Sequence, residues 1–280
     1  MKIRRLLMQK TISNLFAILL TFLFTVLYIG FGFLLGFFNN LSITRAINES
    51  NFYNTVYDDL YQSSEEIITS SNLPIAILSD VVTMDYVYME CKNYVDKALS
   101  GQVHEVNSLE LKSKLSDNIR TYYHSIDNSN TTLIEEKIKT VTDRIGAQYE
   151  KAVKIELANE FNRKKAEYES LIQGIVFICI LLIGIISFIL LKIHKYKHRG
   201  IRYIIYSLGI STGLVMIAAT LTMLTKVYTN INIKPDYYNK VVNAYIRWDM
   251  ILFIYMGCIS IVVGAGLIYY SNYLKNKIIE

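Results

Sequence analysis

Two histidines lie in the charged middle of the sequence, where they could act with nearby carboxylates as acid–base groups or metal ligands. They are His104 and His124, about 20 residues apart. A zinc site needs several His or Cys residues at a recognisable spacing, and neither H-E-x-x-H nor C-x-x-C occurs. We therefore expect no metal and no cofactor, and a hydrolase built on either histidine is the least favoured class of function.

Paired carboxylates offer no better catalytic centre. Neighbours in sequence point in different directions on a helix, so such pairs do not converge as an acid and a base. No G-x-S-x-G, phosphate-binding loop or dinucleotide-binding motif occurs. We expect no catalytic residue and no enzymatic activity. The pairs are Asp58/Asp59, Glu65/Glu66 and Glu135/Glu136.

Four long apolar blocks without Asp, Glu, Lys or Arg determine the overall organisation of the chain and flank the segment that carries these residues. Each block has the roughly 20 residues needed to cross about 30 Å of hydrocarbon. Because proton relays and ion ligands need ionisable groups, blocks lacking them argue against ion-coupled transport and intramembrane proteolysis. The blocks run over residues 11–44, 170–191, 203–225 and 250–274.

The first block also has to be distinguished from a cleavable signal peptide. A signal peptide has an apolar core of about 7–15 residues followed by small residues. Here the apolar run from Leu15 to Phe38 is longer and ends in Phe37, Phe38, Asn39 and Asn40. We interpret it as a retained membrane anchor.

The distribution of charge predicts the orientation. The N-terminus has four basic residues and the 192–202 loop has five, with no acidic residue in either. Basic flanking loops favour the cytoplasmic side, so both termini are expected inside. Residues 45–169 hold 14 basic and 21 acidic residues, a net charge of −7, which fits an extracytoplasmic domain. The total charge of +5 therefore does not indicate nucleic-acid binding.

We predict an all-α polytopic membrane protein with four transmembrane helices and an extracytoplasmic helical bundle. The predicted segments are a cytoplasmic N-terminus (1–12), a first span (13–39), the extracytoplasmic domain (40–170), a second span (171–192), a basic cytoplasmic loop (193–202), a third span (203–225), an external loop (226–249), a fourth span (250–274) and a cytoplasmic C-terminus (275–280).

Helical signals continue throughout the 40–170 segment. Thr83 is typical of an N-cap for a helix over 84–100, with Gly101 just past its end. Another helix is expected from Ser108, with Leu111, Leu115 and Ile119 on one face. No proline occurs between about Leu133 and Lys192, so we expect one long stalk helix that runs into span two.

The external 226–249 loop contains an amphipathic helix that follows Pro235. Its aromatic residues either lie in the headgroup layer or pack under the external domain, and the sequence does not decide between the two. These interfacial candidates are Tyr237, Tyr238, Tyr245 and Trp248.

Small residues spaced four apart suggest close helix packing within three of the spans. Packing of the four spans on one another is the simpler interpretation, and a homo-oligomer seam is the alternative. The candidates are Gly32, Gly36, Gly209, Gly213, Ser260 and Gly264.

Cysteines and overall composition give weaker indications. Cys91 is the only cysteine outside the apolar blocks, so no disulfide can form within the external domain. Abundant Ile, Asn, Lys and Tyr with only two prolines suggest an AT-rich genome, for which we expect a Gram-positive bacterial source.

Two resemblances bear on function. The runs 51–57, 70–74, 77–83 and 94–96 resemble a class of uncharacterised bacterial four-span integral membrane proteins, which implies the architecture and no activity. The order of one span, an external domain and three spans is similar to FtsX- and MacB-type ABC subunits, which implies a mechanotransmitting permease that works with a separate ATPase.

These observations favour a non-enzymatic protein of the cell membrane, either a sensor, a regulator or an assembly factor. Its expected partners are the lipid bilayer and another membrane or surface protein, with no nucleic acid. The FtsX/MacB-like subunit is the alternative, although an 11-residue basic loop leaves little room for a helix that docks on an ATPase.

Overall fold

The computed structural model describes residues 2–126, 131–231 and 233–279, and over these ranges the fold is all-helical without strands, as predicted. In chain order the elements are α1 (Lys2–Gly32), η1 (Phe33–Phe37), α2 (Asn40–Glu49), α3 (Phe52–Ser70), η2 (Ile75–Leu78), α4 (Met84–Leu99), α5 (Leu109–Ile126), α6 (Thr131–Val153), α7 (Glu156–Ile193), α8 (Lys197–Thr225), η3 (Val227–Asn230) and α9 (Asp236–Ile279).

Four helical stretches in the described ranges are long and apolar enough to cross a membrane. Each overlaps one of the four charge-free blocks, so the prediction of four helices able to span a membrane is confirmed. They lie within Gln9–Phe37, Ile134–Ile193, Lys197–Thr225 and Asp236–Lys277.

The chain divides into two compact units, which are described separately. Unit 1 comprises residues 1–46, 166–232 and 242–280, and unit 2 comprises residues 47–165 and 233–241.

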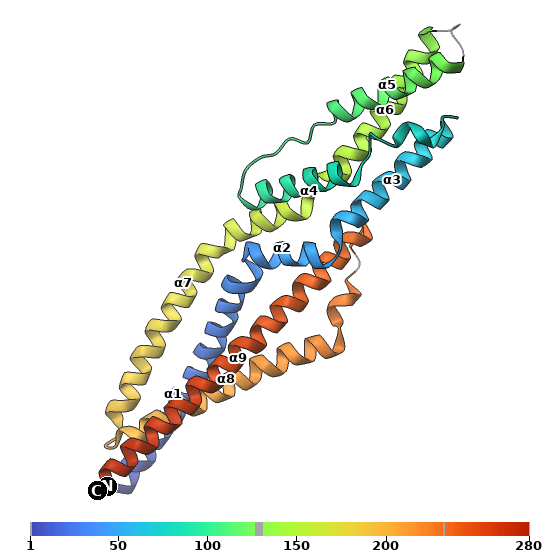
Figure 1. The fold of residues 1–280 in the computed structure, drawn as a ribbon. Coiled ribbons are helices and arrows are strands. Elements are labelled where there is room, and N and C mark those ends of the chain that lie inside the picture. The colour runs from blue at the N-terminus through green and yellow to red at the C-terminus, as the bar shows by residue number, and fades with distance from the viewer. Residues whose placement is uncertain (1, 127–130, 232, 280) are drawn as a thin grey trace. The chain divides into compact units, whose positions relative to one another are not determined.

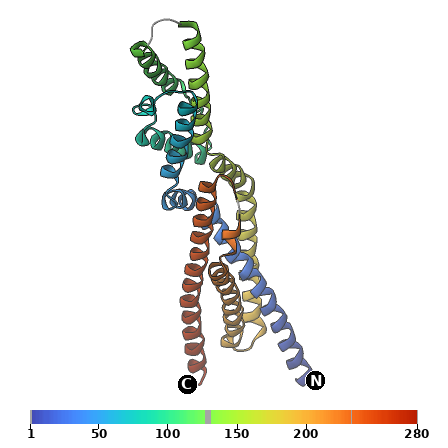
Figure 2. The ribbon, with the colours of Figure 1, turned by 90° about the vertical axis from the view of Figure 1, so that its right-hand side faces the viewer.

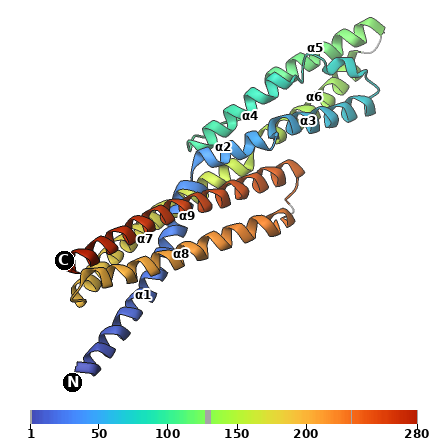
Figure 3. The same ribbon diagram turned by 60° about the horizontal axis from the view of Figure 1, so that its bottom comes forward.

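In unit 1, α1 runs obliquely past α8 and packs against it (Figure 3). A core cluster joins α1 and α7 through five buried side chains, with Tyr203 and Ile204 of α8 packed against it. Hydroxyl groups add polar contacts between helices: Ser207 Oγ donates to the Ala17 carbonyl at 2.7 Å. The five buried residues are Leu20, Leu23, Cys179, Ile186 and Leu190.

The end of the first apolar helix is a π-helical turn, η1, that side chains cap. The Phe38 amide donates to the Phe33 carbonyl at 2.7 Å, which closes the wider turn. Asn39 donates from Nδ2 to the Leu35 carbonyl at 3.1 Å and accepts from the Leu41 amide at 3.0 Å. One asparagine thereby satisfies a carbonyl at the end of one helix and an amide at the start of the next.

Unit 2 is a helical bundle in which α6 packs against α3, α4 and α5. Figure 1 labels these four helices, and Figure 2 shows α5 and α6 side by side. Thr83 accepts from the Tyr86 amide at 3.4 Å as N-cap of α4, and Gly101 follows that helix with a φ of +76°. Both predictions are confirmed, since a left-handed residue after a helix favours glycine.

The expected single stalk helix is interrupted at Lys154 and Ile155, between α6 and α7. Val153, Ile155 and Ala158 are all buried. At 100° per residue, Val153 and Ile155 would point in nearly opposite directions on one straight helix. The two-residue interruption lets both enter the same core, and for this reason the prediction of one unbroken helix was wrong.

The amphipathic segment after Pro235 and the fourth apolar block form one helix, α9. Pro235 directly precedes it, as expected for a residue at a helix start. No glycine or proline occurs between Asp236 and Gly257, so nothing in the sequence ends the helix where the external loop was expected to finish.

Candidate functional site

A groove of about 610 Å³ opens in unit 2 between α4, the 101–108 loop and the facing parts of α6 and α7. The loop supplies His104 and Glu105, α6 supplies Glu150, and α7 supplies Asn159. The groove therefore combines acidic, imidazole and amide groups from segments far apart in the sequence.

Hydrogen bonds hold the walls of this groove together. Asn159 Nδ2 donates to the Tyr94 hydroxyl at 2.6 Å, which ties α7 to α4. The buried Ser108 donates its hydroxyl to the Glu150 carboxylate, which ties the start of α5 to α6. Both bonds link segments that are far apart in the sequence, and they fix the positions of the side chains that line the groove.

His104 is the titratable residue of the groove with the closest charged neighbours. Its Nε2 lies 3.5 Å from the Glu90 carboxylate, and Lys97 Nζ lies 3.2 Å from its Nδ1. The contact with Lys97 is the hydrogen-bond contact of the ring, whereas Nε2 has no hydrogen-bond partner and lies only within ion-pair distance of Glu90. No serine, threonine or cysteine nucleophile is bonded to it among these contacts.

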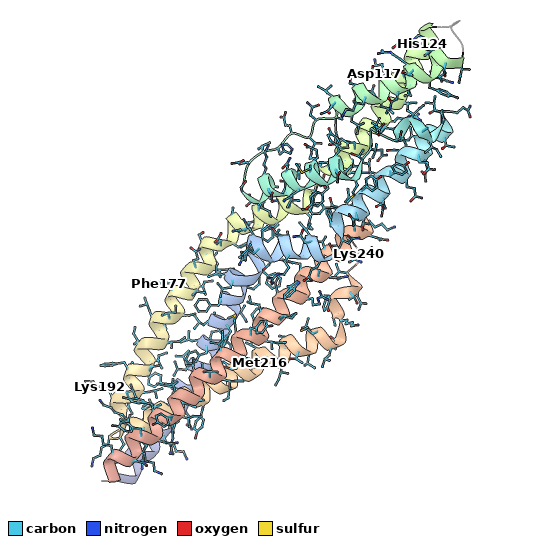
Figure 4. All side chains as sticks on the ribbon, in the orientation of Figure 1. Asp117, His124, Phe177, Lys192, Met216 and Lys240 are labelled. Carbon is cyan, nitrogen blue, oxygen red and sulfur yellow. The ribbon has the colours of Figure 1, made fainter. Side chains whose placement is uncertain are left out.

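The two histidines singled out in the sequence do not come together. His104 precedes α5, whereas His124 lies near the other end of that helix (Figure 4). At 1.5 Å per residue, α5 separates them by roughly 20 Å. In the described ranges, no group of three His, Cys, Asp or Glu side chains could hold a metal ion.

Cys91 lies in the core of unit 2 and has no exposed surface. Burial raises the pKa of its thiol to about 12, with a smaller contribution from Glu90. A thiol in this state is a poor nucleophile. It packs as a small apolar residue.

The small residues of the first span lie against α9. A Cβ at Gly32 would overlap the ring of Phe253, and a Cβ at Gly36 would lie 2.8 Å from Asp249 Oδ1 and 2.9 Å from Leu252 Cδ2. Only a residue without a side chain allows these approaches.

The small residues of α8 and α9 divide into two kinds. Ser260 is buried and lies 2.7 Å from the Thr212 hydroxyl, which joins α9 to α8. Gly209, Gly213 and Gly264 have no atom of another segment within 4 Å of a Cβ built on them.

The aromatic residues near the start of α9 contact other parts of the chain. Within unit 2, Phe52 lies 5.4 Å from the Tyr237 ring and 6.0 Å from the Tyr238 ring, between centroids.

The two later aromatics of α9 contact the end of the first apolar helix in unit 1. Tyr245 donates its hydroxyl to the Phe37 carbonyl, and Arg45 lies 4.5 Å from the centre of the Trp248 ring.

No family model matches this chain, and no curated protein or solved structure shows significant similarity to it.

Sequence reasoning missed Asp249, whose side chain is 1% exposed and whose two carboxylate oxygens have no hydrogen-bond partner. A block defined by the absence of charge starts at Met250 and so excludes Asp249, although the helix continues through both residues. The sequence does contain a signal for it. Asp249 lies one helical turn after Tyr245 and directly before an apolar run, and no helix-ending residue separates it from that run.

Proposed function

We propose that this chain is a non-enzymatic integral membrane protein that acts as a sensor, regulator or assembly factor at the bacterial cell membrane. In this proposal the four apolar helices span the bilayer, both termini are cytoplasmic, and unit 2 faces outward to bind another membrane or surface protein.

The observation that carries the proposal is the exposed 101–108 loop beside the groove. Val103 is 92% exposed, and Leu109 at the start of α5 is 69% exposed. Val103 lines the groove and Leu109 follows the same loop, so a protein that docks there covers these two apolar side chains together with the polar groups of the groove. The residues that line the groove include no serine, threonine or cysteine, and no group of three metal-ligating side chains occurs among the described residues.

Charge indicates the chemistry of the partner. Residues 45–169 carry a net charge of −7, and the groove is lined by two acidic residues, Glu105 and Glu150, and one basic residue, Lys154. A surface of this sign attracts basic partners and raises their rate of association. We therefore propose a protein that presents an apolar side chain flanked by Lys or Arg.

The partner is tested with a photo-cross-linking amino acid at Val103 in the full chain, in living cells. We expect one discrete cross-linked species whose yield falls with added salt and falls strongly in the Glu105→Lys variant. The matched control carries the cross-linker at Lys139, an exposed position on α6. Equal cross-linking at both positions, or none at Val103, would contradict the proposal.

The orientation requires its own test, because the buried native Cys91 is unsuited to it. We replace the three native cysteines and introduce Val103→Cys or Lys195→Cys, both at exposed positions. An impermeant maleimide applied to intact cells should label the first variant and spare the second. Labelling of Lys195→Cys alone would place unit 2 inside the cell and refute the topology.

The alternative, an FtsX/MacB-like permease or mechanotransmission subunit, is supported by the order of its segments. Only residues 194–196 separate α7 from α8, which leaves no separate coupling helix between them. The alternative requires an ATPase subunit to co-purify in mild detergent, whereas the leading proposal does not.

A further inference from the structure

Asp249 is buried in a setting that disfavours a negative charge. The side chain is 1% exposed, and neither carboxylate oxygen has a hydrogen-bond partner. An isolated carboxylate withdrawn from water costs several kcal/mol or more, and such a group commonly remains neutral by keeping its proton.

Within the described ranges, no cation is bonded to the carboxylate of Asp249. Its Oδ1 faces the buried Gly36 of η1, in the stretch from Thr11 to Thr44 that lacks Asp, Glu, Lys and Arg. On α9 itself, the titratable neighbours in sequence are Arg247, two residues earlier, and Tyr245, whose hydroxyl donates to the Phe37 carbonyl.

From α2, the nearby charged group is Arg45, which lies over the neighbouring Trp248 ring. From α8, the hydroxyl of Thr212 lies near Ser260, about three helical turns along α9 from Asp249. No positive group is paired with this carboxyl among the described residues.

The geometry fits a proton better than a metal ion. A monovalent or divalent metal ion needs several oxygen ligands around it. Asp249 is a single carboxyl group, and no cluster of three His, Cys, Asp or Glu occurs in the described part of the chain. A proton needs only one carboxylate oxygen.

The segment opposite Asp249 is a π-helical turn, a form that is uncommon and is frequent at functional sites. Gly36 has no Cβ, so the carboxyl approaches the backbone of η1 directly. Tyr245, one turn earlier on α9, is bonded to the carbonyl at the end of the same turn. Asp249 thus lies at the contact between the first and the fourth apolar helices.

We propose that Asp249 is a proton-binding site that controls the contact between η1 and α9. The protonated carboxyl packs against Gly36. Loss of the proton places an unpaired charge there and separates the two segments, so that water or a cation can reach the carboxylate. This inference goes beyond partner binding and does not depend on what unit 2 contacts.

The only tryptophan of the chain, Trp248, is the residue next to Asp249 and reports on this contact. We measure its emission against pH with the full chain in lipid nanodiscs. We expect one transition, above the range near pH 3.9 in which solvated aspartates titrate. The Asp249→Asn variant, which is nearly isosteric, should lose the transition and keep the low-pH spectrum throughout.

The matched control is Asp236→Asn, which removes the other acidic residue of the described part of α9, an exposed one. Its transition should have the wild-type midpoint. A transition that survives in Asp249→Asn, or its absence in the wild type, overturns the proposal.

If Asp249→Asn does not fold, infrared spectroscopy of the wild type provides a second measurement. At neutral pH it should show the carbonyl stretch of a protonated carboxylic acid, which is lost as the pH rises with the tryptophan transition. Absence of that band at neutral pH also overturns the proposal. Failure of the cross-linking at Val103 leaves both measurements unaffected, so the two proposals can fail separately.

Discussion

Gly32 offers the sharpest test of packing between the apolar helices. A methyl group at this position would overlap Cζ and Cε1 of the Phe253 ring. Forcing an extra carbon into a packed interior costs about 1–3 kcal/mol. Alanine in place of glycine recovers up to about 1 kcal/mol of helix propensity. Gly32→Ala should therefore lower the free energy of unfolding by about 1–2 kcal/mol, measured by reversible unfolding in mixed detergent–SDS micelles.

Gly209→Ala is the matched control, because no atom of another segment lies within 4 Å of its Cβ position. It gains the same helix propensity without the overlap, so the two variants should differ by about 1–3 kcal/mol. Trimming the ring with Phe253→Leu should reduce the cost of Gly32→Ala in a double-mutant cycle. Equal stability of the two alanine variants would refute the close approach of α1 and α9.

Three further outcomes are expected. Asn159→Ala should destabilise unit 2 by about 1 kcal/mol in chemical denaturation, because it removes the hydrogen bond to Tyr94. Little change in stability would mean that water replaces this hydrogen bond. Cys91 should resist maleimide in the native protein at pH 7–8 and react after unfolding in SDS, because its thiol is buried and burial raises its pKa to about 12. Rapid labelling of the native protein would show that the core of unit 2 opens. Arg120→Ala should lower the free energy of unfolding by at most about 1 kcal/mol, and by less at high salt, because the 3.0 Å ion pair of Arg120 with Glu135 is half-exposed. A larger loss that does not change with salt would contradict an exposed, screened ion pair.

The helical architecture was predictable because its signals are local. Charge-free blocks of 20 or more residues identify the four long apolar helices through composition alone. The N-cap Thr83 and the C-terminal Gly101 predict the bounds of α4 for the same reason, since each acts on amides or dihedral angles within a few residues.

The features that the sequence left undetermined depend on contacts between distant segments. The interruption after Val153 arises because Ile155 also enters the core, and no proline or glycine indicates it. The burial of Asp249 depends on Gly36, more than 200 residues away. Likewise, the spacing of Gly209 resembles that of Gly32, yet only Gly32 has a neighbour against it.

The step between α6 and α7 has a mechanical consequence. A straight helix carries twist along its axis through an unbroken ladder of amide hydrogen bonds. Here the ladder of α6 ends with the bond from the Lys154 amide to the Glu150 carbonyl, and α7 begins again at Glu156. Because Val153, Ile155 and Ala158 are all buried, the interruption is a fixed elbow and not a loose joint. Any torque on α7 would reach α6 through packed side chains. A polar residue at position 155 should therefore weaken the packing between the end of α6 and the start of α7 and leave both helices intact.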